Sequence, residues 1–366
     1  MERKSKLTIK ITIFCVLIVA YLVSLLFAKQ IEGLINTSTH SVNKEGAVVQ
    51  TTDTQIHYID VGQGDCTVIE LPNNKLLMID TGIKSKITQL KNYLDEVIFD
   101  NAVYNNSIDY LILTHTDADH IGGAVSIINS YEIKTIYRPN LTVPTTSKMW
   151  KNTVAAIEDE VPAEKIIYTD KDTPAIVYDD PNGTSRDYSF SFYAPIQESF
   201  SNNNDYSPFM IFKIGAKTFM FTGDASDSIE KDVLDYYASD LSILDVDVLK
   251  AGHHGSGSSS CEEFLQATTP KYAVISCGKD NSYGHPHNDT IERFTNIGAA
   301  ILRTDTSGTI LAFVNDDNEI NFIADYFEPN TYYIEWWYCG LTILAAVGAG
   351  LFVRKGKRYS TRRTDR

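Results

Sequence analysis

The polar segment that follows one predicted buried strand limits what this chain can fold into more than any other feature of the sequence. Residues 108–113 form a short, largely apolar run typical of a buried β-strand, and residues 121–128 form an apolar run typical of a helix. Between them, four side chains that can bind metals lie within six residues: His115, Asp117, Asp119 and His120. Imidazole and carboxylate together suit Zn²⁺ and, where oxygen ligands dominate, Mn²⁺. The sequence therefore predicts a metal site where a strand ends and a helix begins.

Four further segments accompany this loop, in the order in which one known family carries them. They are Asp60-Val61-Gly62-Gln63-Gly64-Asp65, Phe221-Thr222-Gly223-Asp224, Lys250-Ala251-Gly252-His253-His254-Gly255-Ser256 and Ser282-Tyr283-Gly284-His285-Pro286-His287. Over residues 54–325 the chain thus resembles the metallo-β-lactamase fold of hydrolases, specifically the soluble domain of ComEC-type competence proteins. The resemblance implies an α/β fold in which two sheets pack between layers of helices, an αββα sandwich.

The resemblance also implies two divalent metal ions, Zn²⁺ or Mn²⁺, as cofactors. The expected ligands are His115 and Asp117 for the first ion, Asp119, His120 and His285 for the second, and Asp224 as a bridge between them. Two departures from the family pattern are visible. Asp117 stands where the family usually has a histidine, and residues 201–207 lack another histidine. Asp205 or the carbonyl of an asparagine in this segment, such as Asn204, is expected to complete the first site. More oxygen ligands favour Mn²⁺.

The predicted catalytic groups are Asp119 and the adjacent pair His253 and His254. An imidazole titrates near neutral pH, so one of the pair is expected to give a proton to the leaving group. The small residues that follow, 255–260, are expected to offer backbone N–H groups to an anionic oxygen. The alternative is a flexible loop with exposed histidines.

Several other polar residues are predicted to support the site. Asp80, at the end of a strand, is expected to accept a hydrogen bond from a ligand imidazole. Asp60 and Asp65 lie in a glycine-bounded turn, where the alternative is that they only satisfy the backbone of a hairpin. His287 is expected to support a ligand or to contact phosphate, and the role of Tyr283 stays open. For Asp224 the alternative is a turn that follows a strand.

Two uncharged segments flank the predicted domain. Residues 11–28 and 336–353 carry no charge, and each is long enough to cross about 30 Å of hydrocarbon. The chain carries −15 in total, the first ten residues +3 and the last thirteen +6, which leaves −24 between them. Basic flanks stay in the cytoplasm. A cleaved signal peptide is the alternative for the first segment.

The expected order along the chain follows from these flanks. It is a cytoplasmic tail at 1–10, a membrane helix at 11–28, a stalk at 29–53, an extracellular hydrolase domain at 54–325, a membrane helix at 332–353 and a basic cytoplasmic tail at 354–366. The lipid bilayer is therefore one expected partner of the chain.

The predicted function is that of a membrane-anchored, extracytoplasmic, metal-dependent hydrolase of phosphoesters. The resemblance implies a phosphodiesterase or nuclease acting on DNA. The acidic domain argues against tight binding of duplex DNA, which depends on Lys and Arg. Two alternatives stay open: a hydrolase of a small or cell-wall phosphoester, and a non-catalytic metal-binding sensor. No protein partner can be named from the sequence.

The remaining elements follow from hydrophobic period and turn residues. Strands are expected at residues 55–60, 66–71, 75–80, 135–137, 189–193, 209–214, 218–221, 247–251, 273–277, 300–303, 309–314 and 320–323, and helices at 85–99, 148–158, 226–237 and 261–267. Residues 131–190 are otherwise expected to form an irregular insert beside the site.

The predicted topology can be tested with reporter fusions. A reporter placed after residue 40 should be extracytoplasmic, and one placed after residue 366 should be cytoplasmic, because the basic flanks of both spans stay inside. An enzyme active only outside the cell, compared with one active only inside, distinguishes the two locations. Detection of both junctions in the same compartment would refute the topology.

Overall fold

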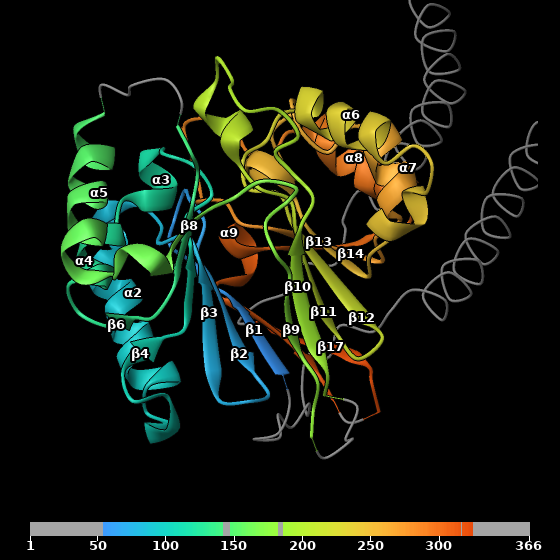
Figure 1. Ribbon diagram of the computed structural model, residues 1–366. Coiled ribbons are helices and arrows are strands. Elements are labelled where there is room, and N and C mark those ends of the chain that lie inside the picture. The colour runs from blue at the N-terminus through green and yellow to red at the C-terminus, as the bar shows by residue number, and fades with distance from the viewer. Residues whose placement is uncertain (1–53, 142–146, 182–185, 316, 325–366) are drawn as a thin grey trace, which may run out of the picture. The chain divides into compact units, whose positions relative to one another are not determined.

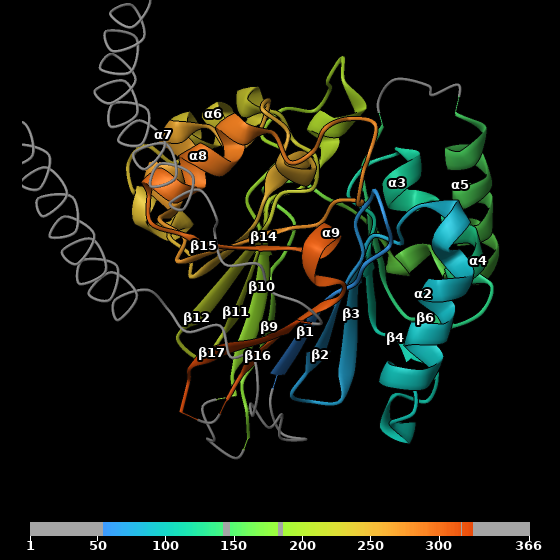
Figure 2. The ribbon, with the colours of Figure 1, turned by 180° about the vertical axis from the view of Figure 1, so that it is seen from behind.

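Two mixed β-sheets lie face to face between two groups of helices, as Figure 1 and the reverse view in Figure 2 show. The structure is a computed structural model, and it describes residues 54–141, 147–181, 186–315 and 317–324. These described residues belong to one compact unit. The layers follow the order helices, sheet, sheet, helices, which is the sandwich expected from the sequence.

The first sheet has the strand order β17-β16-β1-β2-β3-β5-β7-β8. Its strands are β1 (Thr54–Tyr58), β2 (Thr67–Leu71), β3 (Lys75–Ile79), β5 (Tyr110–Ile112), β7 (Ile136–Arg138), β8 (Ile166–Tyr168), β16 (Ile310–Val314) and β17 (Ile320–Ala324). Strands β3, β5, β7 and β8 run parallel, whereas the other pairs are antiparallel.

The second sheet has the order β15-β14-β13-β12-β11-β10-β9. Its strands are β9 (Ile176–Tyr178), β10 (Tyr188–Phe192), β11 (Met210–Ile214), β12 (Lys217–Phe221), β13 (Val248–Lys250), β14 (Tyr272–Ile275) and β15 (Ala300–Arg303). Strands β12 to β15 run parallel. A separate short pair joins β4 (Ser107–Ile108) to β6 (Glu132–Ile133).

Alternation of side chains along the strands builds three apolar layers. Between the sheets lie aromatic residues such as Tyr58 and Phe221, whose rings stack at 6.1 Å. The outer face of the first sheet is covered by α2 (Ile87–Tyr93), α3 (Ala118–Ile121), α4 (Ala124–Ile128) and α5 (Lys148–Glu160). The outer face of the second is covered by α6 (Asp227–Tyr236), α7 (Glu262–Thr268) and α8 (Asn288–Asn296). A short helix, α9 (Thr304–Ser307), follows β15.

Most predicted strands are present, and three predictions need correction. The apolar run at 121–128 is two short helices, α3 and α4, because Gly122 and Gly123 separate them. Within 131–190 the predicted strand and helix are present as β7 and α5, but the remainder is not an irregular insert, since β8 extends the first sheet and β9 extends the second. The amphipathic helix α8, which buries Ile291 and Phe294 three residues apart, was not predicted.

The predicted membrane segments, 11–28 and 332–353, and the stalk at 29–53 lie outside the described residues. Within the ranges that are described, no helix combines the length and the apolar character needed to cross a bilayer.

The docking of the two sheets predicts a large effect of one aromatic residue. Phe190 of β10 is fully buried and meets Tyr110 of β5 edge-on, with ring centroids 5.2 Å apart. Phe190→Ala should lower the free energy of unfolding by about 3–5 kcal/mol, because it leaves a cavity between the sheets. Chemical denaturation of the full chain measures this change. The control Val177→Ala, on a side chain that is 65% exposed, should change it by less than about 0.5 kcal/mol. Equal effects of the two substitutions would contradict the packing described.

Candidate metal centre

The ends of parallel strands from both sheets meet at one place. In each parallel set the carboxyl ends lie at the same edge, where ligands bind in many α/β proteins. In the first sheet, β3 leads into Asp80 and β5 leads into the loop 114–123. In the second, β12 leads into Asp224, and β13 leads into His253 and His254. The two edges face each other, so loops that are distant in the sequence come into contact.

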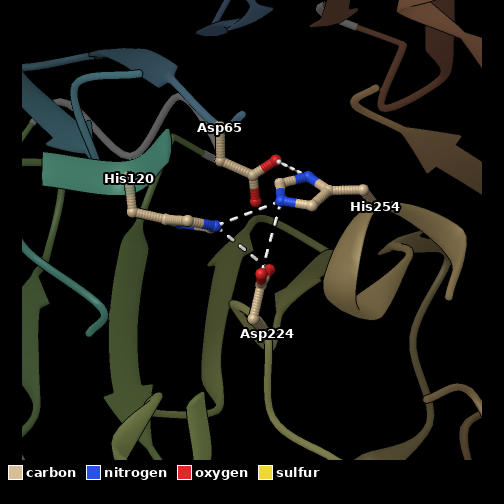
Figure 3. A group of neighbouring side chains, drawn as sticks. All are labelled: Asp65, His120, Asp224 and His254. Atoms are coloured by element: carbon tan, nitrogen blue, oxygen red, sulfur yellow. Dashed lines mark hydrogen bonds and ion pairs between the residues drawn. The ribbon is translucent and has the colours of Figure 1, made fainter. Parts of the chain in front are cut away.

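Four buried side chains point toward one another at this junction: Asp65, His120, Asp224 and His254 (Figure 3). Each offers one nitrogen or oxygen atom, and these atoms all lie within 4.8 Å of one another. Nε2 of His120 lies 3.1 Å from Oδ1 of Asp224. Nε2 of His254 lies 3.3 Å from Oδ2 of the same carboxylate and 3.3 Å from Nε2 of His120.

The hydrogen bonds behind the two rings define which nitrogens face this junction. Nδ1 of His120 lies 2.7 Å from Oδ2 of Asp80, and a carboxylate can only accept, so this nitrogen donates its proton. Nδ1 of His254 likewise donates to the carbonyl oxygen of Ser276 at 3.0 Å. Both Nε2 atoms are therefore left with lone pairs that point at each other. Imidazoles that bind metal ions are held in this way. The contact expected for Asp80 is thus present.

His115 presents a third imidazole with the same arrangement. Its Nδ1 lies 3.1 Å from Oγ1 of Thr114, which donates its single proton to Asp80 and so accepts from the ring. Nε2 of His115 is buried, has no hydrogen-bond partner among the described residues and lies 3.9 Å from Oδ2 of Asp224. Burial, with the neighbouring His120, lowers the pKa of His115 to about 3.

The charges at the junction show that it attracts cations. Burial alone lowers the pKa of His120 and His254, but the nearby carboxylates, Asp224 first, raise both pKa values well above the ordinary one. Burial alone raises the pKa of Asp224, yet the two imidazoles hold it well below its usual range. Protons or a metal ion must lie among these converging lone pairs. Three imidazole nitrogens and a carboxylate fit Zn²⁺ or Mn²⁺.

The two other acids of the metal loop lie at the opening. Oδ2 of Asp119 is 3.3 Å from Nε2 of His254, and the Asp119 side chain is 25% exposed. Asp117 is half-buried and has a hydrogen bond with the side chain of Asn203. Burial and the charge of Asp119 raise the pKa of Asp117. Both carboxylates remain available to a cation.

The segment around His285 borders the junction without joining its central group. The His285 ring lies 5.6 Å from that of His253 and 6.1 Å from that of His254, and burial lowers its pKa to about 4. Tyr283 is 65% exposed and stacks on His285. His287 accepts a hydrogen bond from the N–H of Gly257 and donates to the carbonyl of Tyr283, so both of its nitrogens are engaged.

Three of the predicted supporting residues have structural contacts. Asp60 accepts from the N–H of Gly62, which is the hairpin role given as its alternative. Asp205 accepts from the N–H of Ser226 at the start of α6, so its carboxylate holds that turn in place. Asn204 is buried in the turn Asn203–Tyr206. Among the asparagines of the segment 201–207, it is Asn203 whose side chain has a hydrogen bond with Asp117 of the metal loop.

The N–H groups of residues 256–260, most of the loop at 255–260, cannot be offered to a substrate as expected. The N–H groups of residues 256–260 already bond to His253, His287, Ser256 and Glu230. Arg293 also binds the carbonyl oxygens of Ser259 and Ser260. The loop is therefore a fixed support beneath the histidine pair and not a flexible anion-binding site.

Backbone strain marks the histidine pair. His253 and His254 have φ values of +48° and +56°, a region that residues other than glycine seldom adopt, and such strain concentrates at functional sites. Gly64 has a related role, because a Cβ there would lie 2.3 Å from the carbonyl oxygen of Asp119. Because Gly64 has no Cβ, the turn between β1 and β2 can contact the metal loop, and the N–H of Asp65 donates a hydrogen bond to the carbonyl oxygen of Asp119.

Two charged residues whose place the sequence pattern does not define lie beside the junction. Asp65 was assigned either to a hairpin or to the site, and it lies in the central group. Lys250 lies three positions before His253 and has no role predicted from the sequence, but its ammonium pairs with Asp65 and its side chain is 3% exposed. A lysine at the end of a buried, apolar strand, directly before the histidine pair, is the signal that could have identified it.

Comparison with known proteins gives one family and several relatives. The sequence profile of the "Metallo-beta-lactamase superfamily" matches residues 59–279. "ComE operon protein 3" of Bacillus subtilis is 30% identical over 71% of this chain and 33% of its own length. "Recombination protein 2" of Haemophilus influenzae is 28% identical over 75% of the chain and 31% of its length. The chain thus spans about a third of the length of these relatives.

A similar solved structure is the metallo-beta-lactamase fold protein YhfI from Bacillus subtilis. It covers 68% of this chain and 95% of its own, with 10% identity and a TM-score of 0.40.

The hydrogen bonds that Asp80 accepts predict that a substitution of this residue lowers the affinity for metal ions. Both Asp80 oxygens accept, from the N–H and hydroxyl of Thr114 and from His120. In Asp80→Asn one acceptor becomes an NH₂ group, so His120 must turn its proton toward the junction, and affinity for Zn²⁺ or Mn²⁺ should fall by about 10- to 100-fold. Competition with a chromogenic chelator measures it. Asp109→Asn, which removes a buried charge elsewhere, should leave it unchanged. Unaltered affinity in Asp80→Asn would refute the orientation assigned to His120.

Proposed function

Because this chain belongs to the metallo-β-lactamase superfamily, we propose that it is a metal-dependent hydrolase of phosphodiester bonds. One observation carries the proposal: three buried imidazoles, whose Nδ1 atoms are held by other partners, turn their Nε2 atoms toward the Asp224 carboxylate. A merely structural role for Asp224, as a turn after β12, would not need those three rings. Nor would it explain two successive strained residues at the edge of the junction.

The residues proposed to hold divalent cations come from both sheets. His115, His120, His254 and Asp224 form the buried part of the set, and Asp117 and Asp119 form the part that reaches the opening. His285 is proposed to complete it from the other side. A bound Zn²⁺ or Mn²⁺ would polarise a phosphoryl oxygen and lower the pKa of water.

The two histidines of the pair are proposed to have different roles. Both nitrogens of His254 are engaged within the junction, so this ring has the surroundings of a ligand. The side chain of His253 is 27% exposed, with its Nε2 at 3.6 Å from Oδ2 of Asp224. His253 is therefore the ring that can meet a substrate, and we assign it the transfer of a proton at Nε2 to or from the leaving group.

The proposed substrate is a phosphodiester of a nucleic acid outside the cytoplasm. The name of one relative, "Recombination protein 2", refers to recombination and supports a nucleic acid. The charge of −24 between the basic ends weighs against extensive contact with duplex DNA, which Lys and Arg would have to neutralise. Single strands or short fragments, which need fewer phosphate contacts, agree better with this charge. The uncharged segments at 11–28 and 336–353 support an anchor in the membrane.

The role of Asp224 can be tested by metal content and turnover together. Asp224→Ala removes the carboxylate that the Nε2 atoms of His120 and His254 face. The metal-to-protein ratio should therefore fall, and hydrolysis of bis(p-nitrophenyl) phosphate should drop by more than about a hundredfold. Chelation of the wild-type chain should abolish the same activity, and Mn²⁺ or Zn²⁺ should restore it.

The matched control is Asp235→Ala, which removes an exposed carboxylate from α6. It should retain both metal and activity. If Asp224→Ala hydrolyses the diester as fast as the wild-type chain with full metal content, the proposed mechanism is wrong.

A further inference from the structure

A buried ion pair joins the two sheets beside the candidate metal centre. Lys250 ends β13 of the second sheet, and Asp65 lies in the turn before β2 of the first. Their side chains are 3% and 8% exposed, and Nζ of Lys250 contacts Oδ2 of Asp65. Val248 faces the core between the sheets, so alternation along β13 places Lys250 on that same face. A buried lysine next to a site that attracts cations needs an explanation.

The surroundings of Lys250 limit what it does. Its Nζ has no hydrogen-bond partner among the described residues, so the ion pair with Asp65 is the contact that compensates its charge. The other oxygen of Asp65, Oδ1, lies 3.2 Å from Nδ1 of His254. The carboxylate therefore stands between an ammonium and a ring that is a proposed ligand. The turn itself cannot move away, since the N–H of Asp65 is bonded to Asp119 and its carbonyl to Gly82.

We propose that Lys250 is a built-in counter-cation of the metal centre, whose ammonium holds Asp65 against His254 and keeps this carboxylate from binding the metal. The inference rests on the proposed function, because it needs a metal at the junction. It also has a consequence for charge. The carboxylates around the cations are then Asp80, Asp117, Asp119 and Asp224, whose four negative charges equal the charge of two divalent ions. With Asp65 neutralised by Lys250, a loaded centre is less negative toward an anionic substrate by one charge than it would be with Asp65 unpaired.

A double-mutant cycle on the full chain tests the proposal through metal affinity. Asp65→Asn leaves the Lys250 ammonium unpaired beside the metal, and affinity for Mn²⁺ should fall by about tenfold or more. Lys250→Met frees a buried carboxylate that only a cation can compensate, so affinity should rise by about tenfold. The double variant removes both charges and should bind within about threefold of the wild-type chain. The carbonyl of Ser276 still orients His254 in all three.

The two single substitutions are expected to change metal affinity in opposite directions, which distinguishes this role of Asp65 from direct binding of the metal. If Asp65 were a ligand, Asp65→Asn and the double variant would bind equally weakly, and that result would overturn the proposal. An affinity of Lys250→Met at or below the wild-type value would overturn it as well. Should Lys250→Met not fold, the comparison between Asp65→Asn and the double variant decides alone. Lys271→Met is the matched control, because it breaks a Lys–Asp pair at the other end of the parallel strands and should leave affinity unchanged.

The readout also separates this proposal from the proposed function. Competition with a chelator reports metal affinity without turnover. A chain that shows the expected cycle but does not hydrolyse a phosphodiester refutes the proposed function and supports the counter-cation. A wild-type chain that binds neither Mn²⁺ nor Zn²⁺ overturns both.

Discussion

The contact between Nε2 of His120 and Nε2 of His254, 3.3 Å apart, is the interaction around which the rest of the site is arranged. Each ring donates its other proton to a fixed acceptor, Asp80 for one and Ser276 for the other. Two lone pairs and the Asp224 carboxylate are thus forced together in a buried space, which is unfavourable unless a cation lies among them. The folded chain is therefore stable only with positive charge at this place, which protons or a metal ion supply.

The sandwich explains how that unfavourable contact is maintained. His120 belongs to α3, which follows β5 of the first sheet, whereas Asp224 and His254 follow strands of the second. The core between the sheets, with pairs such as Tyr110 and Phe190, sets the distance between the two edges. Strained backbone at His253 and His254 persists because Glu230 and Arg293 fix the loop that follows. Apolar packing far from the chemistry thus holds the polar groups in place.

The sequence allowed prediction where the signal is local. The five-residue strand β10 alternates clearly, and the metal loop contains its four polar residues within one short segment. The three-residue strands β8 and β9 are partly exposed and carry no periodic pattern, so they were assigned to an irregular insert. Asn203 near Asp117 and the pair of Lys250 with Asp65 depend on long-range docking of the two sheets. No short-range pattern encodes such contacts.

The position of Lys250 also bears on the contrast between an acidic chain and the anionic substrate proposed for it. A chain with −24 between its basic ends repels polyanions at long range, where salt screens the interaction within about 10 Å. At the junction itself the balance of the nearby charges matters more than the net charge of the chain, because buried charges are screened far less. An ammonium that neutralises Asp65 there changes this balance without adding any basic surface. Attraction of a phosphodiester would then be confined to the centre, which suits a hydrolase that cleaves and releases its substrate better than a protein that retains DNA.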